Sequence, residues 1–146
     1  MSNVNEQLSM TGHLQIRLND ELVHDIPNLV VTAGKGFVAS RMIGTSAGVM
    51  SHMEVGTGTT NPAAGDTALQ SAVSSSRTAF SSSAAVSGAV VTYITTFAAG
   101  TGTGALTEAG IFNASSGGTM LCRTEFSVVN KGASDSMTIT WTVTVS

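Results

Sequence analysis

Charged side chains are scarce in this sequence. Asp, Glu, Lys and Arg make up 10% of its 146 residues, against about 25% in an average soluble domain. Ala, Gly, Ser and Thr dominate instead. A surface with few charges repels other proteins weakly, and the cores of protein interfaces are depleted in charge. We therefore expect a protein that assembles with partners, the alternative being a secreted or merely neutral protein.

Basic residues are few and show no clustering. The net charge is −3, and the six basic residues are Arg17, Lys35, Arg41, Arg77, Arg123 and Lys131. A nucleic-acid-binding surface needs several clustered cations that displace counterions from phosphates. The sequence has no such cluster, so we expect no binding to DNA or RNA.

Cysteine and long apolar runs are also rare. Cys122 is the one cysteine, so no disulfide within the chain supports the fold, and we expect a buried, inert thiol. No apolar run approaches the roughly 20 residues of a membrane span, so we predict no membrane partner. Residues 1–10 contain no apolar segment of the kind found in secretory signals, which favours synthesis in a cytoplasm.

The sequence lacks the usual patterns of catalytic and metal sites. His13, His24 and His52 have spacings that match no zinc motif. The glycine-rich stretches 56–58 and 100–104 lack the lysine of a phosphate-binding loop, and are typical of turns. No serine lies in a nucleophile motif. We therefore expect a non-enzymatic protein with no catalytic residue, no cofactor and no metal ligand.

Alternating apolar and polar residues predict β-strands. Leu14, Ile16 and Leu18 alternate with polar residues, and together with residues 21–26 they predict a hairpin around Asn19-Asp20 that ends at Pro27. Further strands are predicted at 53–55, 77–85, 89–97, 106–112, 119–129 and 137–145. Because they recur about every 12 residues with Gly and Ser turns, we predict a mainly β fold, an antiparallel β-sandwich or barrel of meander or jelly-roll-like type with one or two short helices.

The predicted core consists of apolar residues that alternate along these strands. Residues 137–145 give the strongest pattern, with threonines on the opposite face. The core candidates are Met137, Ile139, Trp141, Val143, Val145, Phe112, Phe97 and Tyr93.

Two segments have helical spacing. Residues 32–43 begin with Thr32 as a candidate N-cap, and residues 67–73 follow Asp66 as another candidate N-cap. The chain length suits one domain. Residues 1–10 show no periodicity and are predicted to be a flexible arm, so that residues 11–146 form a single β-rich domain.

Glu108 interrupts an otherwise apolar strand. A buried carboxylate needs a partner, and Arg77 or Arg123 on neighbouring strands can supply it. We expect a structural ion pair at this position.

Four segments together resemble small structural proteins of tailed bacteriophages. They are residues 56–69 (GTGTTNPAAGDTAL), 106–112 (LTEAGIF), 117–123 (GGTMLCR) and 137–145 (MTITWTVTV), so the resemblance covers about residues 53–146. It implies a virion protein, with relatives that include capsid decoration proteins and tail-fibre or tail-associated proteins. The first fifty residues carry no matching motif.

The resemblance implies a capsid decoration (cement) protein as the first interpretation. As a trimer on the outside of a phage head, it would stabilise contacts between capsid subunits, with residues 1–10 and the first hairpin at the shell. Its partners would be other copies of itself and the major capsid protein. The alternative is a tail protein: a fibre, collar or adaptor subunit. A carbohydrate-binding sandwich is the weakest interpretation, because aromatic residues make up only 5% of the chain and Trp141 and Tyr93 are expected in the core.

Overall fold

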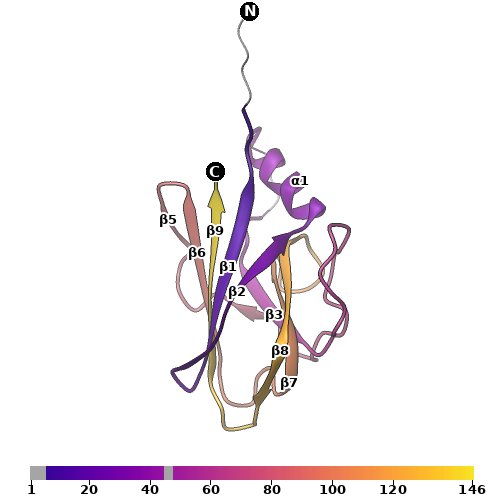
Figure 1. The fold of residues 1–146 in the computed structure, drawn as a ribbon, viewed down its shortest axis with the longest axis vertical. Coiled ribbons are helices and arrows are strands. Elements are labelled where there is room, and N and C mark those ends of the chain that lie inside the picture. The colour runs from indigo at the N-terminus through magenta and orange to yellow at the C-terminus, as the bar shows by residue number, and fades with distance from the viewer. Residues whose placement is uncertain (1–5, 45–47) are drawn as a thin grey trace, which may run out of the picture.

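The computed structural model describes residues 6–44 and 48–146 and shows a mainly β fold (Figure 1). All paired strands are antiparallel, and they form one sheet in the order β4-β3-β7-β8-β2-β1-β9-β6-β5 that curls into a half-barrel. The predicted fold class is confirmed, with one helix in the described part of the chain. The elements are β1 Met10–Leu18, β2 Glu21–Val30, α1 Thr32–Arg41, β3 His52–Gly56, β4 Thr78–Ala79, β5 Ala85–Ser87, β6 Val90–Phe97, β7 Gly104–Phe112, β8 Met120–Lys131 and β9 Met137–Val145.

Strand β2 divides the curled sheet into two walls. It pairs with β1 along most of its length, and at Leu29 and Val30 it pairs with β8 instead. One wall is therefore β5-β6-β9-β1-β2, and the other is β2-β8-β7-β3-β4. Half of the neighbouring strand pairs join strands that are distant in the chain, such as β1 with β9 and β3 with β7. The two halves of the sequence are thus interleaved in each wall.

The core fills the space between the walls. Trp141 is 0% exposed, and its indole N–H donates to Asn28 Oδ1 at 2.9 Å. Six of the eight core candidates are buried, while Val145 and Tyr93 are partly buried. Burial raises the pKa of Tyr93 to about 12, because the phenolate loses its contact with water.

Pro27 does not end the second strand as predicted. Strand β2 continues to Val30. The Thr124 hydroxyl donates to the Pro27 carbonyl at 3.2 Å, so the Pro27 backbone faces β8. Its missing N–H therefore removes no hydrogen bond from the β1–β2 ladder.

The single strand predicted at 77–85 is also wrong. The segment forms the two short strands β4 and β5. Between them, the Phe80 N–H donates to Ser51 O and the Ser81 N–H donates to Ile94 O. The chain thus crosses from one wall to the other here, and no single strand can pair with both.

Helix α1 begins at Thr32, so the prediction of Thr32 as N-cap is wrong. Val31 occupies the cap position without a side-chain hydrogen bond. The Thr32 N–H donates to Ala64 O at 2.8 Å. A carbonyl of the loop between β3 and β4 thus satisfies one of the free N–H groups at the start of the helix. The helix also ends at Arg41 rather than at Ile43.

Candidate functional site

Glu108 lies on β7 beneath the β3–β4 loop (residues 57–77), and it is 0% exposed. Two glycines allow the loop to approach the carboxylate closely. A Cβ at Gly56 would lie 2.6 Å from Glu108 Oε2, and one at Gly58 would lie 2.3 Å from it. Both distances are far inside van der Waals contact. The anion that this glycine-rich stretch cradles is therefore the chain's own carboxylate.

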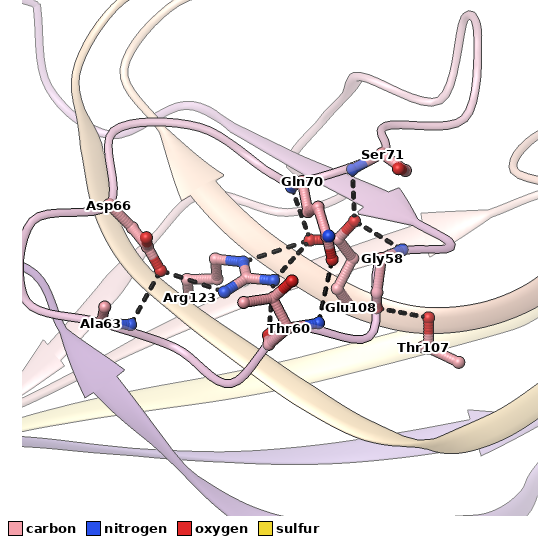
Figure 2. Close-up of polar contacts among 9 residues, drawn as sticks. All are labelled: Gly58, Thr60, Ala63, Asp66, Gln70, Ser71, Thr107, Glu108 and Arg123. Carbon is pink, nitrogen blue, oxygen red and sulfur yellow. Dashed lines mark hydrogen bonds and ion pairs between the residues drawn. The ribbon is translucent and has the colours of Figure 1, made fainter.

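Five hydrogen bonds end on the Glu108 carboxylate (Figure 2). Oε2 accepts from the backbone N–H of Gly58 and of Ser71, each at 2.8 Å. Oε1 accepts from the Gln70 N–H at 2.9 Å and from Arg123 Nε and Nη2 at 3.1 and 2.9 Å. The carboxylate thus ties two distant parts of the loop to strands β7 and β8.

Arg123 extends the same network on β8. Its side chain is 2% exposed, and besides Glu108 it donates to Asp66 Oδ2 at 3.0 Å and to Thr60 O at 2.9 Å. The ion pair predicted for Glu108 is therefore formed with Arg123. The guanidinium also connects Glu108 to the outer turn of the loop, where Asp66 accepts the Ala63 N–H.

The pKa of Glu108 is set by opposing effects. Burial raises this pKa, but hydrogen bonds from the N–H groups of Ser71 and Gln70, from Arg123 and from the Gly58 N–H lower it by more. The net result is a pKa below the ordinary value of 4.5. Glu108 is therefore ionised at neutral pH, and with its oxygens occupied by donors of the chain it acts as a structural anchor.

The helix predicted at 67–73 is wrong, and Glu108 is the reason. The amides of Gln70 and Ser71 donate to the carboxylate, and the Val73 N–H donates to Val55 O. These donors are unavailable for helical hydrogen bonds to residues four positions earlier. Asp66 binds Arg123 and Ala63 rather than capping a helix.

Arg77, the other candidate partner of Glu108, pairs with Glu54 instead, with Nε 3.3 Å from Glu54 Oε2. Its Nη1 donates to Ala114 O and Gly117 O. The guanidinium carbon also lies 3.6 Å from the centre of the Phe112 ring. Arg77 therefore fixes the loop between β7 and β8.

The histidines do not converge on one point in the structure. His13 pairs with Asp25 on the outer face of the hairpin. His24 hydrogen-bonds to Ser127 O at 2.7 Å and packs against Phe126. These two histidines thus lie apart on one hairpin, and His24 is partly buried. Cys122 is fully buried, and burial raises the pKa of its thiol, which keeps it protonated and unreactive.

A threonine face covers the outside of strands β6, β9 and β1. Along β9 the outward residues are all threonines, and their partners on both neighbouring strands point the same way. Only one of these side chains, Arg17, carries a permanent charge. The threonine face consists of Thr138, Thr140, Thr142 and Thr144 on β9, Val90, Thr92, Ile94 and Thr96 on β6, and Thr11, His13, Gln15 and Arg17 on β1.

A second surface, the arm–helix groove, lies at the end of the molecule where β1 begins. It has a volume of about 320 Å³ and is mostly apolar. Leu8 and Met42 on its rim are 78% and 84% exposed. The lining residues are Leu8, Ser9, Met10, Lys35, Val38, Ala39 and Met42.

Sequence reasoning missed the loop anchors and this groove. Asp66 carries a signal, since it is an acidic residue in a stretch of small ones, but the local pattern predicts a helix cap rather than a partner for Arg123. The groove exists because α1 packs beside the start of β1, which no local pattern reveals.

In the described residues, no helix is long and apolar enough to cross a membrane.

Comparison with known proteins gives no relative. No protein-family model, no curated protein and no solved structure matches this chain.

Proposed function

We propose that this protein is a non-enzymatic bacteriophage capsid decoration (cement) protein, which binds the outside of the head as a trimer and stabilises contacts between capsid subunits. The observation that carries the proposal is the threonine face. Twelve outward positions on three adjacent strands hold one permanent charge, Arg17. Lysine and glutamate normally protect such surfaces from association.

The chemistry of this face suits a broad contact with another protein. Its side chains are mostly short and hydroxyl-bearing, so little conformational entropy is lost when they are covered. A decoration protein that binds only the assembled shell stabilises it by mass action. Three copies that bind together gain further affinity, because the second and third contacts become intramolecular.

Copy number in purified particles is the first test of this proposal. Quantitative mass spectrometry against the major capsid protein should give about one copy per capsid subunit. A few to a few dozen copies per particle would instead identify a tail protein, such as a fibre, collar or adaptor subunit. Absence from the particle would overturn the virion assignment.

The contact surface is tested with Thr140→Lys at the centre of the threonine face. A buried, unpaired lysine opposes binding strongly, so the variant should lose most of its occupancy on particles that lack the native protein. Asn130→Lys is the matched control, since Asn130 is an exposed strand residue on β8 in the other wall. Equal occupancy of the two variants would show that the threonine face is not the contact.

A further inference from the structure

The segment Glu6–Ser9 leaves the body of the protein as an extended arm. The Ser9 N–H donates to Ser146 O, and the Ser146 N–H donates to Ser9 O, so the β1–β9 ladder ends at Ser9. Residues 6–8 continue past the end of β9 and are exposed (Figure 1). Leu8 is 78% exposed, which leaves a large apolar side chain in water on a projecting strand.

The arm–helix groove lies beside this arm and has the complementary character. Leu8 itself lines it together with Met10, Val38 and Ala39. Met42 on its rim is 84% exposed. The groove and the projecting leucine therefore occur on the same end of one chain. Such a surface can bind a second copy of itself, each copy giving an arm and receiving one.

Charge supports this choice of occupant. Glu6 is two residues before Leu8, so in an extended arm both side chains point to the same side about 7 Å apart. Lys35 lines the groove. Both residues are exposed, and neither forms an ion pair within the described chain. When Leu8 of one copy fills the groove of another, Glu6 comes within reach of Lys35.

We propose that the arm of one copy docks in the arm–helix groove of a second copy, with Leu8 in the groove and Glu6 paired with Lys35. The proposal rests on the self-association included in the proposed function and names the contact that holds the copies together. The backbone N–H and C=O groups of residues 6–8 are free to pair with the neighbouring copy, since no strand of their own chain pairs with them in the described structure.

The test measures the mass of the purified full-length protein by light scattering and sedimentation over a range of concentrations, without phage particles. The wild type should form dimers or trimers, and Leu8→Asp should be monomeric. Val128→Asp is the matched control, because Val128 is 51% exposed on β8 and outside the groove. It should associate like the wild type. Circular dichroism establishes that both variants fold.

Charge reversal distinguishes the proposed pair from a general apolar contact. Glu6→Lys and Lys35→Glu should each weaken association by about tenfold or more, because each places like charges together. The double variant should recover most of the loss. A monomeric wild type, equal effects of Leu8→Asp and Val128→Asp, or a double variant as weak as the single ones would overturn the proposal. Self-association as described together with absence from phage heads would leave this contact standing and remove the proposed function.

Discussion

Replacing Glu108 with glutamine is expected to lower the free energy of unfolding by about 3 kcal/mol. The change keeps the shape of the side chain but removes its charge, so Arg123, which is 2% exposed, loses its buried counter-ion and keeps only the partly exposed Asp66. Loss of one partner of a buried pair costs about 3–5 kcal/mol. The side-chain NH2 of the new glutamine also faces N–H donors whichever way the amide is turned, because each carboxylate oxygen of Glu108 accepts at least two hydrogen bonds. A donor placed against these donors adds to the loss.

Urea unfolding measures this loss, with the fluorescence of Trp141 as the signal, since the chain has one tryptophan and it is buried. The loss is a large part of the roughly 5–15 kcal/mol that stabilises a typical domain. Amide hydrogen exchange should also become faster at Gly58, Gln70 and Ser71, whose N–H groups bind the carboxylate. Glu54→Gln is the matched control. Its carboxylate is 15% exposed and Arg77 keeps two carbonyl acceptors, so we expect a smaller loss than for Glu108→Gln.

The difference between wild type and Glu108→Gln should shrink in acid. The pKa of Glu108 is lowered in the folded protein from an ordinary value of 4.5. The unfolded chain therefore takes up the proton first, and the stabilisation is complete above about pH 4.5 and lost as the pH falls through the folded pKa. A loss below about 1 kcal/mol at neutral pH, or unchanged exchange of the three amides, would refute the conclusion that Glu108 holds the loop.

Two further substitutions test the packing. Thr95→Val should stabilise the protein by about 1 kcal/mol or more in urea unfolding, because Thr95 is 0% exposed and its hydroxyl has no hydrogen-bond partner. Thr96→Val is its control: it removes the hydrogen bond to Thr138 and should give no gain. Gly58→Ala should destabilise the protein by about 2 kcal/mol or more through the contact with Glu108, whereas Gly65→Ala, with nothing within 4 Å of the added Cβ, should leave the melting temperature nearly unchanged. The packing described would be contradicted if Thr96→Val were more stable than Thr95→Val, or if Gly58→Ala were more stable than Gly65→Ala.

The threonine face and the arm–helix groove lie on different parts of the molecule. The first is the outer side of β6, β9 and β1, and the second lies between the arm and α1. The two proposed contacts, one with a shell and one with a neighbouring copy, can therefore form simultaneously. The tip of the first hairpin lies at the other end of the molecule from the arm (Figure 1), and Asn19 there is bonded to Asp135 and Ser136. If the arm and the whole first hairpin, tip included, both met the shell as expected, the contact would run along the full length of the protein.

Local patterns in the sequence predicted most strands correctly. Along β9 every second residue from Met137 faces the core, because alternation is a property of the extended backbone itself. Asn19 and Asp20 form the predicted hairpin turn with φ of 49° and 68°, which these two residue types tolerate. The burial of Glu108 and its need for an arginine also followed from the sequence, since a charge inside an apolar strand has few other solutions.

The tertiary structure alone decided which partner each backbone group finds. Residues 67–73 have helical spacing, but their amides bind a carboxylate that lies on β7, 37 residues further along the chain from Ser71. The order of the nine strands and the choice of Arg123 over Arg77 depend on the same long-range pairing. Local sequence determines how a segment can fold, because its periodicity and turns act within a few residues. The final hydrogen bonds are determined by segments distant in the chain, because burial leaves each donor with whichever acceptor the packed walls bring to it.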